Sequence, residues 1–397
     1  MPLTARDRAI AIALATIACI AYVAAGWDLP TVYDYQGRLA DALVHGRWWL
    51  VEDPAWLNEL LSCGDGRFCV AYPPLPAVLA IPVLFAGTAQ SQSLVAQLCG
   101  GLSSGVLYLA CRVLGAPRAI ALSGAVLSAF GTTLLFSSAD GRAWFVAHSV
   151  AMLFTSLAML LAARGGPGWG VGAAVGLAAL ARLPVAAAFP ALALLLARRA
   201  DIPYTRALRG IVLGGASLAL VYVAYDLMRW GTIFDSGYTR LAEGDIFFNF
   251  GVFSPLYIPR HVVAIFLEPP EIVPGSPTFL RFHTVGMSLF LATPAFLWVF
   301  AGLRLVRRDP AILALALASA LALLPDVLHG TVGFAQFGYR FSIDAQPFLV
   351  GLAISGDAKR GGPWRRWPSI GFTGAIVAGV IINIYATIAI MRLGLWE

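Results

Sequence analysis

Apolar runs long enough to cross a lipid bilayer recur along this chain of 397 residues. A helix that crosses a hydrocarbon core about 30 Å thick needs roughly 20 mostly apolar residues. Lipid offers no hydrogen-bond partner to the backbone, so such runs must form helices in a membrane. Only 12% of the residues are charged, whereas a soluble domain carries about 25%. The sequence therefore predicts an all-α, polytopic membrane protein and excludes an ordinary soluble enzyme.

The apolar runs predict about 10 to 12 transmembrane helices. No internal repeat or low-complexity linker separates them, so we expect a single domain over residues 1–397. The run 168–197 contains Arg182 and Pro184 and is compatible with one kinked helix or with two short ones. The predicted spans are 9–26, 73–88, 93–111, 119–137, 145–163, 168–197, 210–228, 284–303, 311–325, 345–355 and 369–391.

Positive charge gathers in short stretches that, by the positive-inside rule, face the cytoplasm. These stretches contain Arg6 and Arg8; Arg198, Arg199, Arg206 and Arg209; Arg304, Arg307 and Arg308; and Lys359, Arg360, Arg365 and Arg366. The long polar segments 27–72, 229–283 and 326–343, together with the C-terminus, then lie on the outer side of the cell membrane. Arg112 and Arg118 conflict with this scheme, because two full spans between residues 73 and 111 would place them outside. Either one of those runs is re-entrant, or Arg112 and Arg118 do not indicate the side of the membrane on which they lie.

The first outer segment contains the stretch YDYQGRLADALVHGRWW, residues 33–49. Leu39, Leu43 and Val44 recur in it at helical spacing, with charged residues on the other faces. This pattern predicts a short amphipathic helix that lies in the membrane interface.

Two aspartates near this helix are candidates for a catalytic base. Asp34 stands at the start of the helix, where it is either an N-cap or a general base at the rim of an outward cavity. Asp28 competes for the same role, and a plain interfacial turn before Pro30 is the alternative for it.

Three further candidates stand near the ends of predicted spans. Tyr72 opens a span and is either a residue of the aromatic belt or part of a site. His148 lies about one turn into a helix, where hydrogen bonding inside the bundle is the commoner role. Arg182 interrupts a span at a cost of roughly 2.5–3.5 kcal/mol on insertion scales, so it should face protein, water or an anion, or else snorkel at a helix end.

The later outer segments add Tyr238, Arg240, Arg260 and Arg340 as candidates for substrate binding. Arg340 stands four residues before Asp344, so a local ion pair is one account of it and a bound phosphate is the other. Arginines, tyrosines and carboxylates from several segments thus converge on one face of the membrane.

Other patterns narrow the chemistry. No metal-binding spacing and no phosphate-binding glycine loop is present, so we expect neither a metal nor another cofactor. No basic stretch is interleaved with aromatic residues, so nucleic acid is not expected as a partner. Cys63 and Cys69 share the first outer segment, and whether they pair is open.

The order of motifs resembles the GT-C superfamily of membrane glycosyltransferases. An acidic residue after the first span, then GRW at 46–48 and YPPL at 72–75, is similar to its family-39 group, which includes protein O-mannosyltransferases and the lipid A aminoarabinose transferase. The chain departs from the group because Tyr35, rather than Glu, follows Asp34. Further similar stretches are GLAALARLP, RWGTIFDSGY, SPLYIPRHV and FGYRFSIDAQPF.

The resemblance implies a glycosyltransferase that takes a sugar from a polyprenyl-phosphate donor and transfers it, with inversion, to a lipid, glycan or protein acceptor. In it Asp34 would be the base, and arginines such as Arg340 and Arg240 would hold the donor phosphate. Two alternatives remain open: a transporter or flippase for a lipid-linked precursor, and a catalytically inactive scaffold of the same fold.

Overall fold

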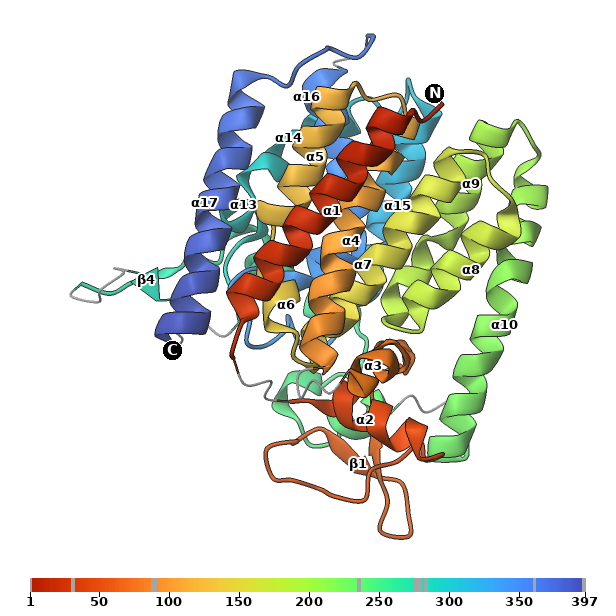
Figure 1. Cartoon of the computed structure of the whole chain (residues 1–397), viewed down its shortest axis with the longest axis vertical. Coiled ribbons are helices and arrows are strands. Elements are labelled where there is room, and N and C mark those ends of the chain that lie inside the picture. The colour runs from red at the N-terminus through yellow and green to blue at the C-terminus, as the bar shows by residue number, and fades with distance from the viewer. Residues whose placement is uncertain are drawn as a thin grey trace.

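The computed structural model describes residues 2–29, 33–86, 91–233, 237–274, 280–281, 285–359 and 362–394. It is a bundle of helices that run between two opposite ends, with the N-terminus at one end and the C-terminus towards the other (Figure 1). The strands of the described residues form two short antiparallel pairs. The all-α, polytopic architecture that the apolar runs predict is confirmed.

Seven helices in the described part of the chain are long and apolar enough to cross a membrane. The pair α5 (Arg118–Phe130) and α6 (Leu134–Asp140) is bent by 48° and makes an eighth if it acts as one span. The seven are α1 (Ala5–Gly26), α4 (Ser91–Val113), α7 (Ala143–Ala163), the 3-10 turn η1 (Leu183–Ala188) continued by α9 (Phe189–Ala200), α10 (Tyr204–Trp230), α15 (Pro310–Val327) and α17 (Ile370–Leu393).

Shorter helices occupy the other predicted runs. The run 168–197, left open above, forms two helices that are separated at Arg182, since Pro184 begins a new turn there. The short elements are α8 (Gly168–Ala179), α13 (Leu289–Ala292), η4 (Pro294–Phe296), α14 (Leu297–Leu303) and α16 (Gln346–Ala358).

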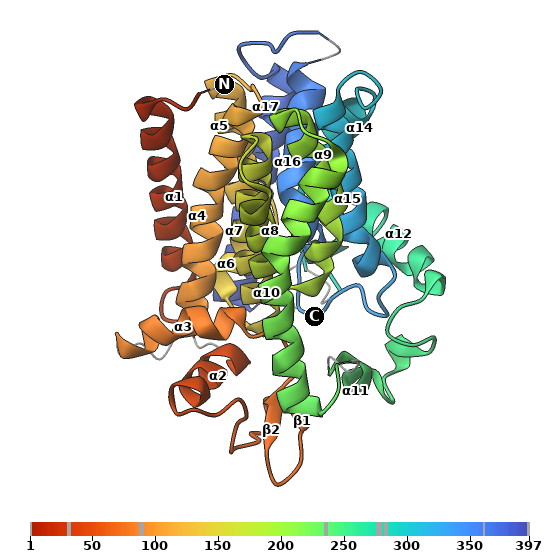
Figure 2. The ribbon, with the colours of Figure 1, turned by 90° about the vertical axis from the view of Figure 1, so that its right-hand side faces the viewer.

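The run 73–88 is not the upright span that its hydropathy predicts. It forms α3 (Leu75–Phe85), which lies across the end of the bundle (Figure 2). Its 11 residues extend about 16 Å at 1.5 Å per residue, roughly half the thickness of a hydrocarbon core. The conflict over Arg112 and Arg118 therefore disappears, because α4 crosses the bundle without a second span before it.

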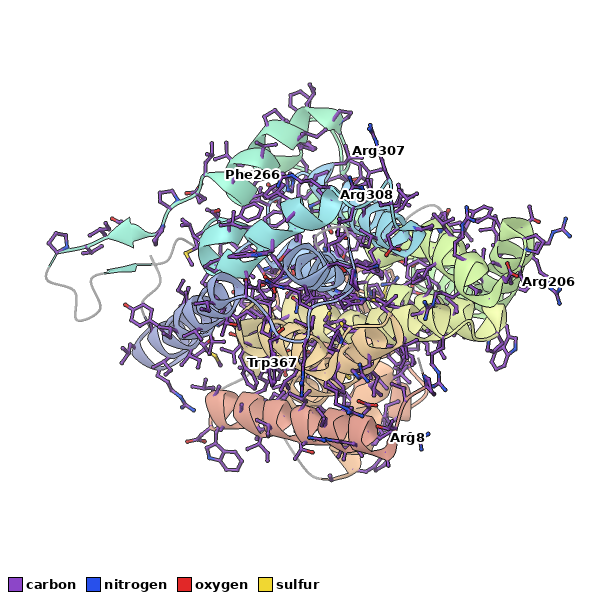
Figure 3. All side chains as sticks on the ribbon, turned by 90° about the horizontal axis from the view of Figure 1, so that it is seen from above. Arg8, Arg206, Phe266, Arg307, Arg308 and Trp367 are labelled. Carbon is purple, nitrogen blue, oxygen red and sulfur yellow. A yellow bond between two sulfur atoms is a disulfide. The ribbon has the colours of Figure 1, made fainter. Side chains whose placement is uncertain are left out.

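Arg112 and Arg118 lie at the same end of the bundle as the N-terminus. Both donate from Nε to Oδ1 of Asp7 at 2.9 Å, and Asp7 is fully buried near the start of α1. Figure 3 views this end from above, with Arg8, Arg206, Arg307 and Arg308 placed around it. We call it the arginine end. The predicted clustering of positive charge on one side is thus present in the fold.

The opposite end, which we call the loop end, carries the described parts of the three long polar segments (Figures 1 and 2). The helix predicted within residues 33–49 is present here as α2. The elements of these segments are α2 (Tyr35–Val44), β1 (Leu60–Ser62), β2 (Phe68–Val70), α11 (Tyr238–Ala242), η2 (Ile246–Phe248), η3 (Pro255–Tyr257), α12 (Ile258–Phe266), β3 (Glu271–Ile272), β4 (Leu280–Arg281) and η5 (Arg340–Ala345).

A disulfide closes the hairpin formed by β1 and β2. The strands pair Leu60 with Val70, and Cys63 is bonded to Cys69 beyond the end of β1. The pairing that the sequence left open is therefore formed. Because Glu59 directly precedes β1 and Tyr72 follows β2, the hairpin fixes both residues relative to each other.

Glycines allow α8 to pack closely along α10. A Cβ atom on Gly172 would lie 2.0 Å from the carbonyl oxygen of Ile211, and one on Gly214 would lie 2.0 Å from that of Trp169. Small residues allow such close backbone contact between helices in membranes. The contact fixes the course of α8, whose end leads directly to Arg182.

Candidate functional site

A cavity of about 720 Å³ lies at the loop end. Side chains from all three long polar segments and from the adjoining ends of the helices line it. The polar and aromatic lining residues are Tyr33, Asn58, Glu59, Tyr72, Trp144, His148, Arg182, Tyr238, Thr239, Asp245, Phe247, Phe248, Phe253, Arg260, Asp326, His329, Thr331, Phe334, Arg340 and Phe341.

Arg182 lies in this cavity between two buried carboxylates. Its Nη2 donates to Oδ1 of Asp326 at 2.6 Å, and its Nε donates to Oδ2 of Asp344. Nδ1 of His148 donates to the other oxygen of Asp344 at 2.8 Å. Both carboxylates bind this guanidinium inside the protein, so the snorkelling account of Arg182 does not apply. The positive charge of Arg182 is therefore compensated within the protein.

Arg340 is in the opposite situation. It is 6% exposed, and within the described chain it forms no ion pair; its Nη1 donates to the carbonyl oxygen of Phe334 and its Nε has no hydrogen-bond partner. Burial, followed by the positive charge of Arg182, lowers the pKa of Arg340 to about 9. The guanidinium is still charged at neutral pH. Asp344, which the sequence offered as one of two partners for Arg340, is bound to Arg182 and His148 instead.

Arg260 is a second arginine in the cavity wall that is not paired with a carboxylate of the described residues. It donates from Nη1 to the carbonyl oxygens of Phe247 and Gly330, and its guanidinium lies 5.2 Å from the ring centre of Tyr257. Backbone carbonyls and an aromatic ring hold this side chain in place without cancelling its charge. Two positively charged groups therefore face the cavity with capacity for an anion.

Glu59 is the carboxylate of the first polar segment that lines the cavity. Its Oε2 accepts from Nε1 of Trp144 at 2.9 Å, and its backbone N–H donates to the hydroxyl of Tyr35 at 2.9 Å. Burial raises the pKa of Glu59 to about 7, even though the Trp144 hydrogen bond and the charge of Arg340 lower it. A carboxyl group with this pKa exchanges a proton readily near neutral pH.

An aromatic wall connects these polar groups. Nε1 of Trp144 also approaches the hydroxyl of Tyr72 at 2.8 Å, and the indole lies 4.9 Å from the ring of Tyr33 between ring centres. Tyr72 is 6.4 Å from Tyr238, again between ring centres. Such rings offer flat, partly apolar surfaces with hydroxyl groups at their edges, which suits a sugar.

Six of the seven predicted substrate-binding residues line this one cavity: Tyr72, His148, Arg182, Tyr238, Arg260 and Arg340. They come from distant parts of the chain, as the convergence on one face predicts. Arg240 is outside the lining, and its guanidinium stacks 4.7 Å from the ring centre of Trp230.

The two predicted base candidates lie outside the cavity lining as well. Oδ1 of Asp34 accepts from Nε of Arg38 at 2.9 Å, and the aspartate makes no capping hydrogen bond to α2. Asp28 is exposed, with its backbone in the left-handed region at φ 60°. Their catalytic role stays a prediction.

Sequence reasoning missed Glu59, Trp144 and Asp326 as lining residues. Glu59 stands in a polar loop without a motif, and Asp326 ends an apolar helix where it looks like a surface residue. A signal was available for Asp326 alone: the arginine in the run 168–197, since a guanidinium within an apolar run is stabilised by carboxylate partners. Within the described residues, no cluster of three His, Cys, Asp or Glu side chains is arranged to hold a metal ion.

No protein-family model and no curated protein matches the chain. Among solved structures, the chain is similar to two of the oligosaccharyltransferase of Archaeoglobus fulgidus, one in the apo form and one in complex with an inhibitory peptide and a dolichol-phosphate. The apo structure is 15% identical with a TM-score of 0.47, over 95% of this chain and 55% of its own. The complex is 14% identical with a TM-score of 0.48, over 97% and 56%. This chain thus spans about half the length of the proteins in those structures.

Proposed function

We propose that this protein is a membrane glycosyltransferase that uses a polyprenyl-phosphate sugar as donor. The observation that carries the proposal is Arg340, a buried arginine in a cavity wall with no carboxylate partner in the described chain. An isolated buried charge is unfavourable, so a site that keeps one is suited to bind the opposite charge. A phosphate group supplies that charge and matches the planar guanidinium with two parallel hydrogen bonds.

The other arginines of the cavity support this assignment by contrast. Arg182 is paired with two carboxylates, so it orders the wall without holding an anion of its own. Arg260 lies in the same lining without an ion pair to a described residue and is a second ligand for the phosphate. Arginine is better suited than lysine to such a site, because it presents several donors in one plane.

The lipid part of such a donor also has a suitable surface. Phe247 and Phe253 line the cavity, and 46% and 58% of their surfaces are exposed. Apolar side chains that reach from a polar cavity to the outside of a membrane bundle fit an isoprenoid chain, which stays in lipid while its phosphate enters. A soluble nucleotide-sugar would not need this surface.

The chemistry is a single displacement at the anomeric carbon. The acceptor oxygen attacks that carbon while the bond to the phosphate oxygen breaks and leaves its electron pair on the phosphate. The phosphate needs no proton to leave, because arginines stabilise its charge. One displacement inverts the anomeric centre. By the positive-inside rule, the loop end and its cavity face the outside of the cell.

The acceptor must lose a proton, and the sequence offers Asp34 for that step. To act there, Asp34 would have to leave Arg38 and reach the cavity from the start of α2, beside Tyr33 of the lining. The acceptor itself is a lipid, glycan or protein with a free hydroxyl or amine.

The proposal is tested with purified protein and radiolabelled polyprenyl-phosphate sugars of several kinds, with water as a slow universal acceptor. We expect release of free polyprenyl phosphate from at least one donor, and weaker donor binding in Arg340→Lys although the charge is retained. Arg206→Lys, at the exposed arginine end, is the matched control and should behave as the parent. Binding of donors without any turnover would instead support a flippase or scaffold, and equal donor affinity in Arg340→Lys would remove the phosphate site from this cavity.

A further inference from the structure

We propose that Glu59 is a catalytic residue of this site and accepts the proton of the incoming acceptor. The inference rests on the proposed function and gives it a proton acceptor that no sequence motif marks. Three features of the structure carry it: how Glu59 is held, what separates it from Arg340, and what binds the alternative carboxylate Asp34.

Glu59 is held with one carboxylate oxygen bound and the other available. Oε2 accepts from Trp144, and the backbone N–H is fixed by the hydroxyl of Tyr35. Within the described chain Oε1 forms no hydrogen bond, although the residue lines the cavity. The hairpin closed by Cys63 and Cys69 begins directly after Glu59 and limits the movement of the backbone there. A fixed carboxylate with one free oxygen is the arrangement that a general base requires.

Trp144 contacts both Glu59 and Arg340. Its N–H binds Glu59, and the guanidinium carbon of Arg340 lies 5.8 Å from its ring centre. The two opposite charges are thus close enough to interact but do not pair directly. A substrate whose phosphate binds Arg340 would have its anomeric carbon between the two groups. Glu59 would then take the proton of the acceptor on one side of the anomeric carbon, while the phosphate leaves towards Arg340 on the other.

Asp34 lacks these features in this arrangement. Its carboxylate is engaged by Arg38 in an ion pair, about 30% of each side chain is exposed, and the residue is outside the cavity lining. To act on a substrate in the cavity, Asp34 would have to break this ion pair first.

The proposed step balances without a further reactant. The O–H or N–H proton of the acceptor passes to Oε1 of Glu59 as the acceptor atom bonds to the anomeric carbon. The bond from that carbon to the phosphate oxygen breaks, and the phosphate leaves with the electron pair and is held by Arg340 and Arg260. Glu59 returns its proton to water after the product leaves.

The charge environment of Glu59 predicts a pH profile. A base must be deprotonated to act, so activity should fall as the pH drops through the raised pKa of Glu59, about 7. Its titratable neighbours are Arg340 from η5, Tyr35 from α2, Tyr72 after β2 and Tyr238 from α11. Tyrosines titrate near pH 10 or above, and the pKa of Arg340 is lowered only to about 9. The charges of these neighbours therefore stay constant near pH 7. His148 also lines the cavity, and the Glu59 variants below separate its contribution to the pH profile from that of Glu59.

The test compares Glu59→Gln, Glu59→Asp and Asp34→Asn in the donor-turnover assay. We expect Glu59→Gln to lower kcat by about 10²–10⁴-fold and to abolish the acid limb of the pH profile, with donor Kd unchanged. Glu59→Asp should retain part of the activity, with the acid limb shifted to lower pH. Glu243→Gln, an exposed glutamate of the same end, is the matched control.

The outcomes separate this inference from the proposed function. Unchanged donor binding in Glu59→Gln shows that the cavity is intact, so the loss of turnover is chemical. If Asp34→Asn loses the activity and Glu59→Gln keeps it, the inference is wrong while the glycosyltransferase stands. If the unmodified protein turns over no donor, the proposed function is wrong, and so is the inference that rests on it.

Discussion

Arg182 and Arg340 lie in the same cavity, and the charges that surround each guanidinium differ. Arg182 binds Asp326 and Asp344, which are both almost fully buried. Arg340 has a backbone carbonyl as its partner and an Nε without one. Removing the first breaks two buried ion pairs, whereas removing the second breaks no ion pair of the described residues. The two residues should therefore separate stability from function.

We expect Arg182→Gln to destabilise the protein by roughly 3–5 kcal/mol, the usual effect of breaking a buried ion pair on one side. Arg340→Gln should be no less stable than the parent, because it removes a buried charge that lacks an ion-pair partner among the described residues, while donor binding is lost. Thermal unfolding midpoints in detergent measure the stability of both variants, with Arg206→Gln as the exposed control. A large loss of stability in Arg340→Gln, or none in Arg182→Gln, would show that the charges are compensated differently.

The sequence predicts residues of this site better than it predicts their partners. Arginines and tyrosines that flank apolar runs are conspicuous, and five of the predicted ones line the cavity, together with His148. An ion pair with Asp344, one helical turn away, was one of the two accounts of Arg340 that the sequence left open. The chain forms a 3-10 turn there, and Asp344 points to Arg182 of a distant element instead. Partners that meet only through tertiary packing leave no local pattern, which is also why Glu59 was missed.

At the scale of elements, the β1–β2 hairpin connects the two sides of the proposed acceptor site. Glu59 precedes it, Tyr72 follows it, and both contact Nε1 of Trp144. A misplacement of about 1 Å in a catalytic group costs on the order of 10²-fold in rate. The disulfide between Cys63 and Cys69 closes the hairpin and keeps these two residues in register.

The double variant Cys63→Ser, Cys69→Ser should therefore lose turnover by about 10- to 100-fold while it binds the donor normally. Turnover and donor affinity, measured side by side, check this. Cys19→Ser, which replaces a free cysteine of α1, is the matched control and should leave both unchanged. Full turnover without the disulfide would mean that the hairpin does not position Glu59.

Hydropathy identified the helical elements well but not their direction. Each predicted run contains a helix, and α1, α4, α7, α10, α15 and α17 are long spans as expected. α3 is equally apolar and yet lies across the bundle, because its 11 residues are too few to cross a membrane and it packs against α2 and α4. Apolar composition reports burial in lipid or protein, and only length and packing distinguish the two.

For the whole molecule, charge is arranged differently at the two ends of the bundle. The arginine end carries exposed guanidiniums around its edge (Figure 3), which suits the surface of a membrane with anionic lipids. The loop end encloses its arginines in a cavity beside carboxylates and aromatic rings. An enclosed cation, and not the larger number of exposed ones, is the feature that favours a specific phosphate ligand. Both ends attract phosphate, so a binding measurement alone does not separate them.

The most direct test is an experimental structure of the full chain with bound polyprenyl phosphate. The account predicts a phosphate in the loop-end cavity within hydrogen-bond distance of the Arg340 guanidinium, with Arg260 as second ligand and the Arg182 ion pairs intact. It also predicts an isoprenoid chain that leaves the cavity past Phe247 and Phe253. A phosphate bound only at the arginine end, or bound to Arg182 in place of its carboxylates while Arg340 stays without a ligand, would contradict it.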